Sequence, residues 1–251
     1  MAKRRKVIRA GQMVYAVVYS VPHVSDKPAA RAAKTKCSTK ARQRMNMKYA
    51  WQKLELELAA NFTAKGLVVT LTYDDAHLPH HRDDAIAKLK KFWVHLRKAR
   101  RLAGQSLQYI YVTEGIHGEK RLHHHAVING TGADLEVLQS LWKHGTVHIE
   151  PVDTSGGYEA LAKYLTKEPR EHGSPNGLRS WTPSRNLQKP QTESSFVPDD
   201  LTLCAPPGAV VLDRDSMVNQ WGEFKYIKYL LPDTPKHRKT PTAPPRKRKI
   251  K

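Results

Sequence analysis

Cysteine is scarce in this chain, and long apolar runs are missing. Only Cys37 and Cys204 occur among 251 residues, which is too few for a disulfide scaffold or a four-cysteine zinc site and is typical of a reducing compartment. No run of eighteen or more apolar residues occurs, so no membrane-spanning segment is predicted. The pattern G-x-x-x-x-G-K-[ST] is also missing, so we expect no fused nucleotide-driven motor.

Acidic residues are missing from three segments, which are residues 1–10, 27–48 and 236–251. These segments carry five, eight and eight Lys or Arg, which accounts for the whole formal net charge of +20. A near-neutral centre with cationic arms suits a polyanion, because each neutralised phosphate releases a condensed counterion. Nucleic acid is therefore the expected partner. A solubility or localisation tail is the alternative, and a membrane surface fits less well because no basic segment has a long apolar face.

The hydrophobic pattern predicts an α+β fold. The expected strands and helices alternate as strand 14–21, helix 38–61, strand 67–73, helix 83–101, strands 107–114 and 122–129, helix 134–143, strand 146–152 and helix 157–168. From residue 67 onward this order matches a ferredoxin-like antiparallel sheet with helices on one face. Basic N- and C-terminal extensions flank it.

Composition divides the chain into four parts. A basic strand-and-helix extension covers residues 1–62, and the core covers 63–170. Residues 171–235 are rich in Gly, Pro, Ser and Asn in their first half and predict a loop-rich region, with a possible strand and helix over 210–231. Residues 236–251 are basic and are predicted to be a disordered tail.

Alternate histidines on one predicted strand form a candidate metal site. Side chains alternate between the faces of a strand, so His123 and His125 point one way and His124 points into the apolar core. If the preceding strand pairs with this one as a hairpin, Glu114 lies beside His123. Two imidazoles and a carboxylate suit Mg²⁺ or Mn²⁺ and leave positions open for phosphate oxygens. A strand with solvent-facing histidines and an exposed turn carboxylate is the alternative.

A second candidate site lies on the predicted helix 157–168. At about 100° per residue, Tyr158 falls on the apolar face and Tyr164 on the opposite face, one turn from Lys167. A phenol with a pKa near 10 is a poor nucleophile unless a cation stabilises the phenolate, and Lys167 could supply that cation. The alternative is an ordinary amphipathic helix with an exposed Tyr and Lys.

Three motifs in this order resemble the HUH endonuclease superfamily, and within it the phage and plasmid rolling-circle replication initiators. LVVTLTY (67–73) looks like the first motif. RLHHHAV (121–127) looks like the second, with His124 where the family has a bulky apolar residue. ALAKYLTK (160–167) looks like the third, a helix carrying Tyr-x-x-Lys. The resemblance covers about two fifths of the chain.

The resemblance implies an enzyme that nicks single-stranded DNA at a replication origin. A metal ion held by His123, His125 and Glu114 would polarise the phosphate, and Tyr164 would attack it, which gives a 5′-phosphotyrosine and a free 3′-OH. Ala160 stands where two-tyrosine members have their other nucleophile, so the chain is expected to be a single-tyrosine enzyme. Host helicase and polymerase are the expected partners, in the cytoplasm of a bacterial cell near the nucleoid.

Nucleic-acid contacts are expected from other residues. The candidates for contact with the DNA backbone are Lys90, Arg97, Lys163, Arg179 and Arg185. Four aromatic residues could stack on bases, although each also fits an ordinary packing role: Tyr109, Tyr111, Trp181 and Trp221.

Two other functions fit the same features. A single-tyrosine transposase or a relaxase would use the same metal and tyrosine chemistry. A single-stranded nucleic-acid-binding protein without catalysis would have structural histidines.

Overall fold

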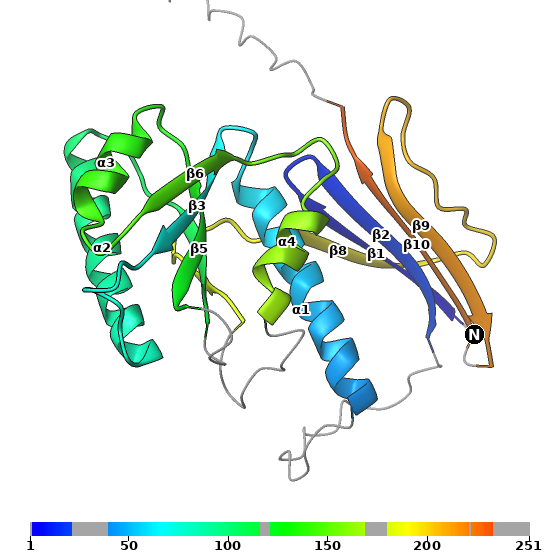
Figure 1. Ribbon diagram of the computed structural model, residues 1–251. Helices are drawn as coiled ribbons and strands as arrows, with labels where there is room; N and C mark the ends of the chain where they lie inside the picture. Colours follow the sequence, from blue (N-terminus) through cyan, green and yellow to red (C-terminus); the bar gives the residue numbers. More distant parts are fainter. Residues whose placement is uncertain (1, 22–39, 116–120, 169–179, 221, 233–251) are drawn as a thin grey trace, which may run out of the picture.

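The structure is a computed structural model of the chain, and it describes residues 2–21, 40–115, 121–168, 180–220 and 222–232. Within these ranges the fold is α+β, as predicted (Figure 1). The elements are β1 (Ala2–Ala10), β2 (Met13–Val21), α1 (Lys40–Asn61), β3 (Gly66–Thr72), α2 (Arg82–Leu102), β4 (Tyr109–Glu114), β5 (His123–Asn129), α3 (Asp134–Leu141), β6 (Val147–Pro151), α4 (Glu159–Leu165), β7 (Thr182–Pro183), β8 (Gln191–Val197), β9 (Val210–Asn219) and β10 (Gly222–Leu230).

The first of two five-stranded sheets contains the predicted core strands, and we call it the core sheet. Its order is β6-β3-β5-β4-β7, and all neighbours are antiparallel. The four strands β6-β3-β5-β4 have the order expected for the β-α-β-β-α-β arrangement. The ferredoxin-like prediction is therefore consistent with this sheet, whose edge is extended by the short strand β7.

Helices cover both faces of the core sheet. The two crossover helices, α2 and α3, pack on one face around Leu71, Trp93 and Leu138, as predicted. Helices α1 and α4 pack on the opposite face around Leu54, Val127 and Ala162, which the prediction of helices on one face did not include. The reason is visible in β5, where alternate residues on both faces are apolar and both faces therefore need cover. Among the described residues, no helix is both long and apolar enough to cross a membrane.

The second sheet joins the two ends of the chain, and we call it the outer sheet. Its order is β8-β1-β2-β10-β9, and it lies on the far side of α1 and α4 from the core sheet (Figure 1). The basic arm at residues 1–10 is therefore a strand. The region 171–235, predicted to be loop-rich, supplies three strands of this sheet. The predicted helix within 210–231 is wrong, because the aromatic and apolar residues of β10 alternate with a period of two. The four-part division itself stays a prediction, and the tail 236–251 lies outside the described residues.

A tight turn positions the outer sheet against α1. β1 and β2 form a hairpin that turns at Gly11, which has φ +58°. A Cβ at this position would lie 2.3 Å from the carbonyl oxygen of Ala59, so only glycine satisfies both the left-handed backbone and the close approach of α1.

Candidate metal and tyrosine site

Three side chains from one hairpin of the core sheet form the candidate metal site. The register of β4 and β5 places Glu114 directly opposite His123, and His125 lies two residues further on the same face. One ligand atom from each of the three residues lies within 4.8 Å of the others. His123 Nε2 is 3.7 Å from Glu114 Oε2 and 3.1 Å from His125 Nε2. This group could hold a metal ion.

Hydrogen bonds at the other ring nitrogens turn both imidazoles toward one point. Nδ1 of His123 lies 2.8 Å from the carbonyl oxygen of Arg121, which can only accept, so this nitrogen carries the proton. Nδ1 of His125 lies 3.0 Å from Thr70 Oγ1. When His125 donates there, both Nε2 lone pairs face each other, and they repel unless a cation lies between them. The donor set therefore fits a divalent cation.

Tyr164 brings a phenol to this group from helix α4. Its side chain is 48% exposed, and its Oη lies 3.2 Å from His125 Nε2. Burial raises the pKa of the Tyr164 phenol, and the carboxylates of Glu114 and Glu150 raise this pKa further. The phenol is therefore protonated at neutral pH, and a nearby cation would be needed to make it a nucleophile.

Tyr158 and Lys167 occupy the other two positions of interest on this segment. Tyr158 is buried, as predicted, and its hydroxyl donates to the carbonyl oxygen of Phe62. It therefore faces the core and cannot reach the metal group. Lys167 lies two residues beyond the end of α4, with an exposed side chain.

His124 holds the middle of the ligand strand in place. Its ring is fully buried, as predicted, and lies on the opposite face of β5 from the two candidate ligands. Nδ1 lies 2.9 Å from Thr113 Oγ1, and Nε2 lies 2.7 Å from Tyr73 Oη. Burial lowers the pKa of His124 to about 3, so the ring is neutral and both of its nitrogens have a partner in the core.

A pocket of about 470 Å³ opens beside the Tyr164 ring, between β6 and α4. Thr70, His148 and Glu150 line it together with Tyr164. His148 Nε2 lies 3.0 Å from Glu150 Oε1 at its rim. The phenol therefore has room on the β6 side as well as on the side of the metal group.

The predicted DNA-binding residues do not gather around this site. Lys90 and Arg97 are exposed on α2, which covers the face of the core sheet opposite Tyr164. Lys163 pairs with Glu159 and lies over the Trp51 ring at 4.9 Å from its centre. Arg185 is exposed just after β7, and Arg179 lies outside the described residues.

The predicted stacking residues are packing residues where the structure describes them. Tyr109 stacks on Trp93, with ring centres 4.3 Å apart. Tyr111 is buried, and Trp181 donates from Nε1 to Glu57 Oε2 at 3.1 Å. Trp221 lies outside the described residues.

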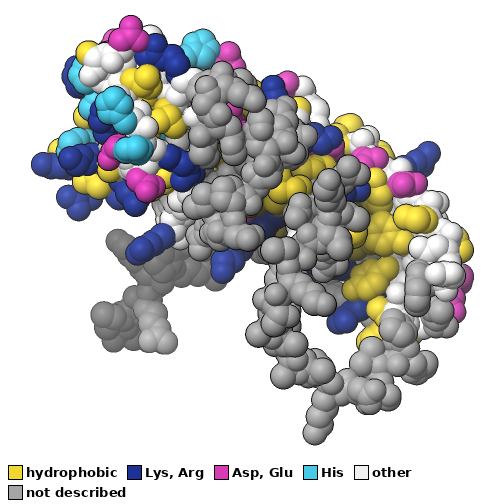
Figure 2. Space-filling model, turned by 60° about the horizontal axis from the view of Figure 1, so that its bottom comes forward, with side chains coloured by type: hydrophobic (Ala, Val, Ile, Leu, Met, Phe, Trp, Pro, Cys, Tyr) yellow, Lys and Arg dark blue, Asp and Glu magenta, His cyan; other side chains and the backbone are white. Residues whose placement is uncertain are grey.

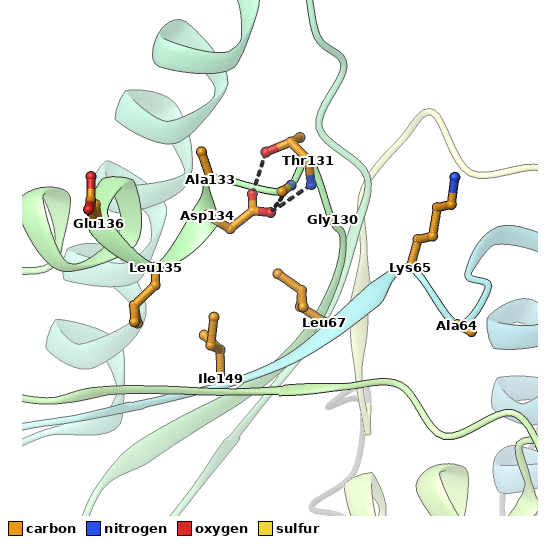
Figure 3. A pocket seen from close by; sticks show the side chains of 11 residues that line it. Ala64, Lys65, Leu67, Gly130, Thr131, Ala133, Asp134, Leu135, Glu136 and Ile149 are labelled. Carbon is orange, nitrogen blue, oxygen red and sulfur yellow. Dashed lines mark hydrogen bonds between the residues drawn. The ribbon is translucent and has the colours of Figure 1, made fainter.

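A larger pocket of about 870 Å³ lies at the opposite end of the core sheet, where β5 runs into α3. Figure 3 shows its floor of Leu67 and Ile149 and the carboxylate of Asp134 at its edge. That carboxylate accepts hydrogen bonds from Thr131 and Gly132 and pairs with Arg100. Because its polar group is satisfied by the protein itself, this pocket gives no indication of a ligand.

Three polar residues that support the site escaped the sequence analysis: Thr70, Tyr73 and Thr113. Thr70 contacts His125 because the register of β3 and β5 places the two residues opposite each other. The pairing of these strands spans 55 residues of sequence. The only available signal was the presence of hydroxyl groups at strand positions, which is common in any sheet.

The fold and the site together define an α+β protein in which a candidate metal group lies beside an exposed tyrosine. A family model for replication-associated proteins of the ORF2 type matches residues 66–169, and this segment contains Glu114, both histidines and Tyr164. The match supports a replication initiator role and implies nucleic acid as the partner. Searches of curated proteins and of solved structures found no match.

Proposed function

We propose that this protein is a rolling-circle replication initiator of the HUH type. It nicks single-stranded DNA at an origin and becomes attached to the cut end through Tyr164. The observation that carries this proposal is the 3.2 Å distance between Tyr164 Oη and His125 Nε2. It brings a phenol beside a group that could hold a metal ion, within the segment matched by the replication-associated family.

In the proposed reaction, Oη of Tyr164 forms a bond to the scissile phosphorus, and the bond from phosphorus to the 3′-oxygen breaks. The phenol loses its proton and the 3′-oxygen gains one, so the products are a 5′-phosphotyrosine and a free 3′-OH. One phosphodiester replaces another, and no ATP is needed. Mg²⁺ or Mn²⁺ bound to Glu114, His123 and His125 would supply Lewis-acid stabilisation of the phosphate charge.

The protein's own residues orient the reacting groups. Thr70 and the Arg121 carbonyl fix the two imidazole rings, and α4 presents the phenol. Lys167, one turn after Tyr164, would steady the negative charge of the phosphate. With Tyr158 buried, a single tyrosine is expected, so a second protomer or a water molecule would finish the cycle. The host would supply helicase and polymerase.

A covalent-adduct assay tests this proposal. Wild-type protein is incubated with Mn²⁺ and single-stranded DNA of the replicon that encodes it, and a protein–DNA band is sought on a denaturing gel. We expect the band with wild type and with Tyr158→Phe, which keeps the catalytic phenol, but not with Tyr164→Phe. Mass spectrometry of the cross-linked peptide names the nucleophile. Wild type without a band across several divalent metals would favour a non-catalytic single-strand binder.

A further inference from the structure

The outer sheet has an inner face that helices cover only in part. Antiparallel residues that lie directly opposite each other share a face. Lys228 of β10 lies on the inner face, because it contacts Glu55 of α1 and Glu159 of α4. Phe224 lies on the same face four residues earlier, yet it is 39% exposed. The helices therefore cover the sheet at the level of Lys228 and leave it open at the level of Phe224.

At this open level, one residue from each of the five strands forms a continuous line across the sheet. Strand register pairs each member with the next. We call this line the aromatic row, and it is about 19 Å wide, since neighbouring strands lie about 4.8 Å apart. Phe196 is 69% exposed and Met217 is 54% exposed. In order across the sheet, the members are Phe196, Arg4, Tyr19, Phe224 and Met217.

Positive charge lies at the β1 side of the aromatic row. The Arg4 guanidinium carbon lies 5.5 Å from the Phe196 ring centre, and Nε donates to Ser194 Oγ at 2.8 Å. A guanidinium stacked in this way keeps further N–H groups for a phosphate. Lys6 is on the same face at the next level, opposite Ser194. The acidic residues of this face lie on β9 at the other edge, where Asp213 accepts a hydrogen bond from Tyr226.

The aromatic row and Tyr164 lie toward the same end of the molecule. In Figure 1, the end of α4 and the start of β1, near the label N, both face the lower side. Figure 2 views the molecule from nearer that side, and hydrophobic side chains with Lys and Arg among them gather on the half formed by the outer sheet. Between the two, α1 contributes the exposed side chains of Lys48 and Tyr49. A strand leaving Tyr164 would cross α1 and reach the row.

We propose that the aromatic row holds single-stranded DNA next to the segment that Tyr164 cuts. Unpaired bases stack on the rings of Phe196, Tyr19 and Phe224, while Arg4 contacts a phosphate. Duplex DNA fits poorly, because its base faces are already stacked on one another. The identity of the strand rests on the proposed function, whereas the binding surface rests on the row alone.

Fluorescence anisotropy with a labelled oligothymidylate, in EDTA so that no cutting occurs, tests this proposal. The double variant Phe196→Ala/Phe224→Ala is expected to bind at least about five-fold more weakly for each ring removed. The variant Phe196→Tyr/Phe224→Tyr keeps the rings and should bind like wild type. Val218→Ala is the matched control, because Val218 is 76% exposed on the opposite face of β9. Thermal melting and sedimentation velocity show whether each variant is folded and whether its oligomeric state has changed.

Unchanged oligothymidylate binding by the folded alanine variant would overturn the proposal, and a simultaneous loss of self-association would instead assign the row to a second copy of the chain. The covalent-adduct assay separates this result from the proposed function. If wild type forms the adduct and the alanine variant binds normally, the row is not a DNA platform and the cutting proposal stands. If wild type forms no adduct but the alanine variant binds weakly, the platform stands without the cutting chemistry.

Discussion

Lys228 Nζ lies 3.0 Å from Glu55 Oε1 in the interior between the outer sheet and helix α1, with both side chains at least 90% buried. The same ammonium contacts Glu159 on the helix that carries Tyr164. Burial raises the pKa of Glu55 although Lys228 pulls it down, whereas the pKa of Lys228 is raised despite its burial, because both carboxylates hold its charge. This cluster ties three layers of the fold together.

Removing the ammonium should destabilise the protein strongly. Lys228→Met leaves the Glu55 carboxylate buried without its main partner, which we expect to lower the free energy of unfolding by about 3–5 kcal/mol. Urea denaturation followed by circular dichroism measures it. The double variant Lys228→Met/Glu55→Gln has no buried charge at Glu55 and should recover part of the loss. Equal losses in both variants would show that the charge pair is not the cause.

Thr70 is expected to set the affinity of the candidate metal site. Thr70→Val keeps the shape of the side chain but removes the hydroxyl that holds His125 Nδ1, and the loss of such an outer partner lowers metal affinity by about 10–100-fold. Calorimetric titration with Mn²⁺ measures this change. Thr70→Ser keeps the hydroxyl and should bind Mn²⁺ like wild type, so a weak Thr70→Ser would point to packing instead.

Tyr158→Phe should affect stability without affecting chemistry. The hydroxyl of Tyr158 donates to the buried carbonyl oxygen of Phe62, and its removal should lower the free energy of unfolding by about 1 kcal/mol. Urea melts test the stability, and the covalent-adduct assay tests the chemistry. Loss of the adduct in the folded variant would contradict the core role assigned to Tyr158.

Asp134 should make the stability of the core depend on acid. Burial raises the pKa of the Asp134 carboxyl, but hydrogen bonds from Thr131 and the charge of Arg100 outweigh burial and lower this pKa overall. A carboxyl whose folded pKa is lowered stabilises the fold above its unfolded pKa, near 3.9, and this contribution is lost as the pH falls further. Melting temperatures between neutral pH and pH 2 should fall less steeply with pH for Asp134→Asn than for wild type. Asp84→Asn, at an exposed position on α2, should follow wild type.

Local patterns carried most of the core. The period of hydrophobic residues located α2, α3, β5 and β6 to within two residues of their observed ends. Strand alternation placed His123 and His125 on one face with His124 on the other, because that rule needs only the sequence of one strand. The helical wheel likewise separated buried Tyr158 from exposed Tyr164.

Long-range pairing could not be read in the same way. The basic residues of β1 indicated a flexible arm, because its apolar residues gain their burial only from partners near the other end of the chain. The contact between Thr70 and His125 depends on the register of two strands that are distant in sequence. The ion cluster at Lys228 joins residues 173 positions apart, and no local signal marks such a partner.

The pairing of β2 with β10 also bears on how the chain is made. Ser20 and Glu223, joined by a hydrogen bond, stand 203 residues apart, so a ribosome completes one strand long before it begins the other. During that interval the apolar edge of the first hairpin is open to neighbouring chains, which is a known route to aggregation. Nascent chains halted before residue 222 should therefore be more prone to proteolysis and clumping than the released protein.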